Sequence, residues 1–429
     1  MFLQFRRTMD RAAWISSELL PSLVAEGTLS SDGAATILSC KVTVPGETGD
    51  HFASSVYIVN LQLGSDDATH EINLIVKMEP DNDFHSKVMD IKVLFANEIL
   101  MYSQALTKFR EYIKSHHERF TFTISDLFPH CYKVTDCNGG SVLILENLKT
   151  KHFSLYEDIF LDYERCVAAL QQLGRYHGLA YAYKKHNPGD FFSVIQKLAE
   201  PRYHNTTPQI NQSMTATALR GIKYVKSQDV EECMLNFLQK IEQQVRDPVV
   251  LMQELVRPTE PLAVLCHGDF CRNNIFFRSS GDDAKPCEMK MFDLQLARYS
   301  SPAIDTAFFA YMSMSAELRK EHWNSLFQCY HTMVVNTLSQ ALNVTIENLG
   351  PEFSLQSFKE DFAKHAIYGY MLCSFFLPIM MSPKDELPDY QLMESQPELA
   401  EQIITQLGGE PATKLLGEIV KEICEINTS

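Results

Sequence analysis

Segments in which apolar residues recur at every second position follow one another through the first third of the chain. This alternation is typical of half-buried β-strands, and it predicts strands at 37–44, 55–63, 71–79, 130–135 and 141–146. Residues that favour turns, mainly Gly, Asp and Pro, separate several of these segments, so neighbouring strands are expected to run antiparallel. The pattern therefore predicts a five-stranded antiparallel sheet with one inserted helix.

Longer segments, with apolar residues three or four positions apart, predict helices. A short amphipathic helix is expected at 12–24, and a long helix at 84–114 is expected between the third and fourth strands. Later helical patterns lie at 163–185, 230–245, 316–342, 355–381 and 397–426, with one β-rich interruption at 264–292. The change in pattern predicts an α+β bilobal protein, with a smaller N-terminal lobe at 1–147 and a larger, mainly helical lobe at 148–429.

Composition places the chain among folded globular proteins, since 45% of residues are hydrophobic and 21% are charged. A formal net charge of −16 argues against nucleic acid and anionic membranes as partners, because such polyanions require a basic surface.

Nothing in the sequence predicts export or membrane insertion. Arg6 and Arg7 interrupt the apolar start of the chain, which does not resemble a secretory signal. The longest apolar run, 366–381, contains Pro378 and is too short to cross a bilayer comfortably. We therefore expect a cytoplasmic protein in which the 11 cysteines are reduced thiols.

The chemistry is concentrated in the segment VLCHGDFCRNNIFF, at 264–277, and in MKMFDLQLARYSSPAID, at 289–305. Each segment has an apolar strand followed by a loop with carboxylate or amide groups, so Asp269, Asn274 and Asp293 are expected to meet. Phosphoryl transfer needs oxygen ligands for Mg²⁺ and one base that accepts a hydroxyl proton. We predict Asn274 and Asp293 as metal ligands and Asp269 as the catalytic base.

His267, Asp269 and Asn274 have the H-x-D-x-x-x-x-N spacing of a kinase catalytic loop, with Gly268 in place of the usual Arg. Any one of these residues alone would be read as a solvated acid or a turn-capping amide, but their combination favours phosphoryl transfer. His267 is expected to be a buried residue that hydrogen-bonds the metal loop. A zinc site that includes Cys266, His267 and Cys271 is disfavoured, because no further pair of ligands lies nearby in the sequence.

The predicted N-terminal lobe supplies a second set of candidates. Lys77 ends the apolar run INLIVKM, and Glu98 follows 21 residues later in the predicted helix. An ATP-contacting lysine on the third strand and a glutamate on the next helix form an ion pair in kinases. We predict that Lys77 and Glu98 bind ATP as such a pair, although each would otherwise be read as a surface charge.

Two further ATP contacts are predicted from position alone. The loop GDHFASS, which contains Ser54 and Ser55, joins the first two strands and is expected to cover phosphates, although it lacks a GxGxxG motif. Without that function the loop would be read as an ordinary hairpin connection. After the fifth strand, the backbone of the segment from Glu146 to Leu148 is expected to contact adenine.

The chain resembles the ecdysteroid kinase-like family, also called CHK kinase-like, which is related to choline kinases and aminoglycoside phosphotransferases. Over nearly the whole chain, the resemblance rests on GDHFASSVYIV, LIVKMEP, LFANEILMY, LILENL, LGRYHGLAYA, CHGDFCRNNIFF and FDLQLARYSSPAIDTAFF, in that order. It implies a protein-kinase-like fold that uses ATP and Mg²⁺. It also implies that Asp305 is a structural acid that braces the catalytic loop. Cys271 stands where the family usually has Trp, which leaves the substrate open.

The expected activity is therefore transfer of the ATP γ-phosphate to a hydroxyl of a mostly apolar metabolite, which the resemblance suggests is an ecdysteroid or a xenobiotic. A protein kinase is less compatible with the sequence, because only 12 positions separate Asp293 from Asp305 and no APE motif follows. A catalytically silent protein that binds nucleotide or steroid is the alternative. The sequence does not indicate substrate-binding residues or the oligomeric state.

Overall fold

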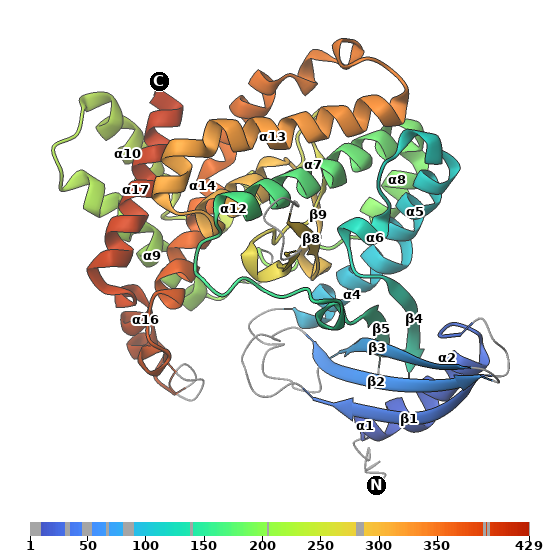
Figure 1. The fold of residues 1–429 in the computed structure, drawn as a ribbon. Coiled ribbons are helices and arrows are strands. Elements are labelled where there is room, and N and C mark those ends of the chain that lie inside the picture. The colour runs from blue at the N-terminus through green and yellow to red at the C-terminus, as the bar shows by residue number, and fades with distance from the viewer. Residues whose placement is uncertain are drawn as a thin grey trace, which may run out of the picture.

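The computed structural model describes residues 10–30, 35–44, 54–65, 68–79, 90–137, 140–203, 206–279, 287–388, 392 and 395–428. Within these residues a β-sheet from the N-terminal part lies at one end of the molecule (Figure 1). Most helices from the later part of the chain gather at the other end, and the C-terminus lies far from the sheet. The α+β architecture predicted from the sequence is confirmed.

The N-terminal sheet has five strands in the order β1-β2-β3-β5-β4, and all neighbouring strands are antiparallel. Their bounds are β1 Thr36–Thr43, β2 Ser55–Ser65, β3 Ala68–Met78, β4 Cys131–Cys137 and β5 Gly140–Glu146. Each predicted strand therefore exists, with ends shifted by only a few residues. In the central pair, Lys77 lies opposite Leu143 and Leu74 lies opposite Glu146.

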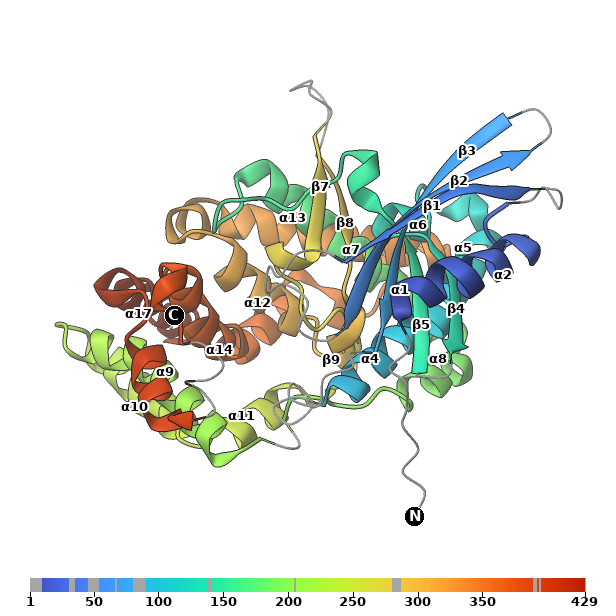
Figure 2. The same ribbon diagram turned by 90° about the horizontal axis from the view of Figure 1, so that it is seen from below.

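The alternation along these strands separates two apolar faces. One face, which includes Val76 and Ile144, packs against the N-terminal helices (Figure 2). These are α1 (Arg11–Trp14), a π-helical turn (Ile15–Leu19) and α2 (Leu20–Ala25). The other face, which includes Leu143 and Leu145, joins the main core together with helices α4 (Ile91–Leu100) and α5 (Leu106–Ser115).

The long helix predicted at 84–114 is interrupted in the structure. Its described part begins at Ile91, residues 80–89 lie outside the described part, and a π-helical turn at Met101–Ala105 separates α4 from α5. The short helix α6 (Ile124–Leu127) precedes β4.

The later helices form pairs around the main core. Their bounds are α7 Tyr163–His186, α8 Pro188–Ile195, α9 Pro208–Lys226, α10 Glu232–Gln244, α11 Pro248–Leu255, α12 Ala303–Ser313, α13 Ala316–Leu342, α14 Leu355–Met380, α16 Pro397–Gln406 and α17 Gly409–Thr428. Helices α7 and α13 approach closely, because Gly174 and Gly178 face the backbone of α13. A Cβ atom at Gly178 would lie 2.7 Å from the Val334 carbonyl oxygen.

Two short antiparallel strand pairs carry the loops in which the candidate chemistry lies. Strand β6 (Val264–Cys266) pairs with β9 (Arg298–Ser300), and β7 (Ile275–Arg278) pairs with β8 (Glu288–Met291). The predicted β-rich interruption is therefore present.

Several helices differ from the sequence-based predictions. The helix expected at 397–426 is two helices, because the chain turns at Gly408, where φ is +67°. Helix α9 was not predicted, although its apolar residues Ile210, Met214, Ala218, Ile222 and Val225 recur three or four positions apart along one side. It lies against α17, so packing of this apolar side stabilises the helix. No helix in the described part of the chain is both long and apolar enough to cross a membrane.

Candidate active site

Lys77 lies next to the last residue of β3, and its side chain connects three distant parts of the chain. Its Nζ atom is 2.8 Å from Glu98 Oε1 and 3.1 Å from Asp293 Oδ1. Burial alone lowers the pKa of Lys77, but the carboxylates of Asp293 and Glu98 outweigh burial and raise the pKa above the ordinary lysine value. The Lys77 side chain is therefore a cation at neutral pH. The predicted partner Glu98 is in contact with it.

Glu98 occupies the buried side of α4, and its side chain is 2% exposed. Burial raises the pKa of Glu98, and the nearby Asp293 carboxylate raises it further, while Lys77 acts in the opposite direction. The neighbouring residue Asn97 is also buried, and its amide nitrogen donates a 2.8 Å hydrogen bond to the Ala199 carbonyl oxygen. Helix α4 is thus fixed to both the sheet and the later part of the chain.

The loop after β6 begins with two residues whose backbone is tightly constrained. Gly268 has φ +82°, and a Cβ atom there would lie 1.8 Å from the Leu296 carbonyl oxygen, so no larger residue fits this backbone. His267 is fully buried, and its Nε2 atom is 3.0 Å from the Phe292 carbonyl oxygen. The expectation that His267 hydrogen-bonds the loop of Asp293 agrees with this contact.

Asn274 ends a short 3₁₀ turn, Arg272–Asn274, and holds Asp269 in place. Its amide nitrogen donates to the Asp269 carbonyl oxygen at 2.8 Å and to Asp269 Oδ2 at 2.8 Å. The amide oxygen of Asn274 diverges from the nitrogen at the same carbon, so it takes no part in these two bonds. Asn274 and Asp269, two of the predicted site residues, are therefore in direct contact.

Asp293 follows β8 after Phe292 and has a left-handed backbone conformation, with φ +68°. This conformation is uncommon for most residues other than Gly, although Asn and Asp adopt it more readily than the rest. Besides its contact with Lys77, the carboxylate accepts a 3.0 Å hydrogen bond from Gln295 Nε2 on its Oδ2 atom. Its side chain is 22% exposed, so other groups have access to it.

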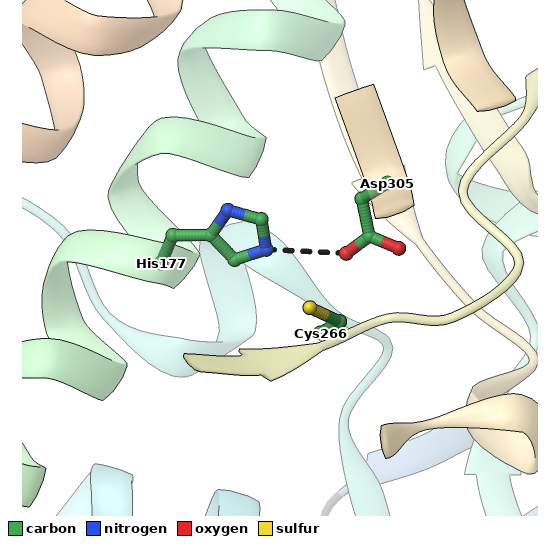
Figure 3. Close-up of side chains that lie close together, drawn as sticks. All are labelled: His177, Cys266 and Asp305. Carbon is green, nitrogen blue, oxygen red and sulfur yellow. Dashed lines mark hydrogen bonds and ion pairs between the residues drawn. The ribbon is translucent and has the colours of Figure 1, made fainter. Parts of the chain in front are cut away.

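The fully buried Asp305 lies behind the loop, near the start of α12. The backbone N–H groups of His267 and Gly268 donate to its two oxygens at 2.7 and 2.8 Å. His177 Nε2, on α7, lies 3.1 Å from Asp305 Oδ2 (Figure 3). Burial raises the pKa of Asp305, but the contact with His177 and the backbone donors outweigh it, so its pKa is lowered. These contacts are those of an acid that braces the loop, as the family resemblance implied.

Cys266, His177 and Asp305 are also the group of possible metal ligands found within the described residues, with their ligand atoms within 4.8 Å of one another. The Cys266 Sγ atom lies 3.2 Å from the Ser301 carbonyl oxygen, and burial raises the pKa of its thiol. The disfavoured zinc alternative named Cys266, His267 and Cys271. Of these only Cys266 belongs to the group found in the described part of the chain.

The remaining predicted ATP contacts lie near the ends of strands. Ser55 is the first residue of β2, opposite Met78, while residues 49–53 of the predicted phosphate loop lie outside the described part. Ser54 precedes this strand. No described contact of Ser54 or Ser55 reaches Lys77, Asp269 or Asp293.

The predicted hinge begins at Glu146. Its N–H group donates to the His130 carbonyl oxygen at 2.9 Å, and the Asn147 N–H group donates to the Asn73 carbonyl oxygen at 3.0 Å. These two donors are therefore used within the protein rather than free for adenine, which restricts the hinge prediction to the other backbone groups of this segment. The Leu148 side chain is buried.

Sequence reasoning missed one charged neighbour of the predicted base. Arg202 lies between α8 and α9, and its Nη2 atom is 3.9 Å from Asp269 Oδ1. The residue stands in an irregular segment, LAEPRYHN, with no periodic pattern or known motif. No signal in the sequence pointed to it.

A sequence profile of the Ecdysteroid kinase-like family matches residues 48–343, more than two thirds of the chain. No curated protein matches the chain. Among solved structures, an ethanolamine kinase from Plasmodium vivax shares 10% sequence identity with a TM-score of 0.34, covering 86% of this chain and 80% of the other. A mutant aminoglycoside 2′-phosphotransferase in complex with GDP shares 12% identity with a TM-score of 0.34, covering 90% and 96%.

Proposed function

Because the chain belongs to the ecdysteroid kinase-like family, we propose that it transfers the γ-phosphoryl group of ATP to a hydroxyl of a small, mostly apolar molecule. Ecdysteroids and hydroxylated xenobiotics are the candidate acceptors. In this proposal residues 1–147 form the nucleotide-binding lobe, and residues 148–429 carry the catalytic loop and bind the acceptor.

The observation that carries the proposal is the double ion pair of Lys77. Its ammonium contacts Glu98 from α4 and Asp293 from the loop after β8, at 2.8 and 3.1 Å. Placing an ammonium between two largely buried carboxylates costs desolvation free energy, and such buried ion pairs add little net stability, so a role in ligand binding is the better explanation. Lys77 is in the place where a kinase lysine contacts the phosphates of ATP.

Asp269 is the group that accepts the acceptor proton. Asn274 holds its Oδ2 atom, while Oδ1 has only the long contact with Arg202 among the described residues. The acceptor oxygen forms a bond to the γ-phosphorus and the bond between that phosphorus and the ADP oxygen breaks. The hydroxyl proton moves to Asp269, and ADP leaves with the electron pair of the broken bond.

The two predicted ligands fit a magnesium ion in their chemistry. Asp293 provides carboxylate oxygens and Asn274 provides an amide oxygen whose nitrogen is already used, and Mg²⁺ prefers such hard oxygen ligands together with phosphates and water. When bound, the ion would neutralise charge on the phosphates. Lys77 would bind the phosphates, and Gln295 and Lys77 orient the Asp293 carboxylate.

A protein substrate is less compatible with this arrangement. Between Asp293 and Asp305 the chain forms only a short 3₁₀ turn (Leu294–Leu296), strand β9 and the start of α12. That length leaves no room for an activation segment with a peptide-binding platform. A small acceptor is therefore proposed.

The test is Mg²⁺-dependent ADP release by the purified protein with a panel of hydroxylated steroids and xenobiotics, with phosphorylated products detected by mass spectrometry. The proposal expects a phosphomonoester product with at least one acceptor and no product without Mg²⁺. ATP binding without turnover on every acceptor would instead support the silent nucleotide-binding alternative.

A further inference from the structure

Arg202 is a cation next to the predicted base Asp269, and it has no role in the proposed phosphoryl transfer so far. Its side chain is 17% exposed, and the Asp269 side chain is 16% exposed. The Nη2 atom is 3.9 Å from Asp269 Oδ1, which is an ion pair but too long for a hydrogen bond. Its Nη1 atom is buried and has no hydrogen-bond partner in the described structure. A guanidinium therefore has unused donors beside the base.

The segment that carries Arg202 is held in place from both sides. Asn97 makes two hydrogen bonds with the backbone of Ala199, one to its carbonyl oxygen at 2.8 Å and one from its N–H at 3.1 Å. The next residue, Glu200, accepts a 3.0 Å hydrogen bond from the Arg202 N–H on Oε1 and lies 3.0 Å from Arg298 Nη1 through Oε2. The backbone that carries Arg202 is thus held before any ligand binds, which lowers the entropy lost on binding.

A structural explanation accounts for only part of these observations. If Arg202 served only to neutralise the Asp269 carboxylate, a direct hydrogen bond between the two side chains would be expected. The distance of 3.9 Å between them is too long for one. The Nη2 atom faces Asp269 without a direct hydrogen bond to that carboxylate, and a ligand oxygen beside Asp269 would supply the acceptor that this donor lacks.

We propose that Arg202 binds the phosphoryl group while it is transferred, and that it holds the phosphate of the product. This inference rests on the proposed function. The acceptor oxygen is next to Asp269 when it gives up its proton, so the phosphoryl group becomes attached beside Arg202. Negative charge on the transferring oxygens then meets the Nη2 donor on the side of Asp269, which favours the transition state over the ground state.

The experiment uses Mg²⁺, ADP and aluminium fluoride, a planar anion that takes the place of the transferring phosphoryl group and needs no known acceptor. Affinity of the full chain for Mg-ADP is measured by calorimetry, and binding of fluoroaluminate to the Mg-ADP complex is followed by ¹⁹F NMR. The variants are Arg202→Gln and Arg202→Lys. Arg175→Gln is the matched control, since Arg175 is a half-buried arginine on α7 that contacts Gln172 and the ring of Phe122.

Arg202→Gln is expected to weaken fluoroaluminate binding roughly 10- to 100-fold, the loss of a charge-assisted hydrogen bond, with unchanged Mg-ADP affinity. Arg202→Lys is expected to restore part of the affinity, because it keeps the charge but not the fork of donors. Arg175→Gln is expected to behave as wild type. A purely structural arginine would lower Mg-ADP affinity and thermal stability together, without a selective effect on the anion.

Equal fluoroaluminate affinity in wild type and Arg202→Gln would overturn the role of Arg202 while leaving the proposed function standing. Failure of the wild-type protein to bind fluoroaluminate in its Mg-ADP complex would also overturn it. Failure of the wild type to bind Mg-ADP at all is a different result, since it would refute the proposed kinase activity itself.

Discussion

Two buried polar clusters adjoin the loop after β6, and they differ in how completely their hydrogen-bonding groups are used. Around Asp305, both carboxylate oxygens accept bonds from the protein, and the side chain is fully buried. Around Lys77, the side chains of Lys77 and Asp293 keep 12% and 22% of their surface exposed. A closed network is suited to fixing the backbone, and an open one is suited to exchanging partners with a ligand.

Substitution of an acid is therefore expected to have opposite results in the two clusters. In the closed cluster around Asp305 it is expected to lower stability first. In the open cluster around Lys77 it is expected to lower ligand binding or turnover first.

Asp269→Asn is expected to lower turnover by roughly two to four orders of magnitude, because the amide cannot accept the acceptor proton. The hydrogen bond from Asn274 lies on the opposite oxygen, so the loop is expected to keep its conformation. Steady-state kinetics with the identified acceptor gives the rate, and calorimetry gives ATP affinity, which is expected to stay at the wild-type value. Wild-type turnover in this variant would remove Asp269 from the mechanism.

Asp305→Ala is expected to destabilise the protein by about 3–5 kcal/mol, because it leaves the His267 and Gly268 N–H groups and the His177 ring without their buried partner. Urea denaturation followed by circular dichroism measures the loss. The matched control is Asp293→Asn, in the open cluster, where Lys77 keeps Glu98 as a partner. Its loss of stability is expected to be the smaller of the two, because the side chain at 293 is 22% exposed and Asn still offers Lys77 an amide oxygen. Similar losses in both variants would remove the distinction between the clusters.

Acid stability provides a smaller test of the closed cluster. The folded-state pKa of Asp305 is lowered, so its carboxylate contributes stability that is fully present above the unfolded-state pKa, about 3.9, and is lost as pH falls through the lower folded-state pKa. The urea midpoint of the wild type is therefore expected to fall between pH 5 and 3 more steeply than that of Asp305→Asn. Parallel pH profiles would show that this acid is not the source of the dependence.

The sequence was sufficient to predict the sheet and two sets of contacts, Lys77 with Glu98 and Asn274 with Asp269, but not all of the contacts around them. Regular alternation identified the five strands, and the motif order placed Lys77, Glu98 and Asp293 in one region, where the structure brings them into contact. Asn97 has a role that no local pattern shows, because its partner Ala199 is 102 residues away. Long-range pairs between irregular segments leave no periodic signal.

Helices α7 and α13 were predicted with nearly their observed bounds. Helix α9 was missed although its apolar residues recur at helical spacing and pack on α17 and α14, so the signal was present in the sequence and was overlooked. The break between α16 and α17 depends on the positive φ of Gly408 and Gly409, and this Gly-Gly pair followed by Pro411 is a helix-ending signal that the prediction of one helix at 397–426 overlooked. Resemblance to a family, rather than periodicity, pointed to Asp305.

Titration of ATP into wild type and Asp293→Ala, with and without Mg²⁺, tests the central claim most directly. The account predicts that Mg²⁺ tightens ATP binding by the wild type and has no effect on Asp293→Ala, because the variant lacks the carboxylate assigned to the ion. Equal enhancement of ATP binding by Mg²⁺ in both proteins would contradict the account.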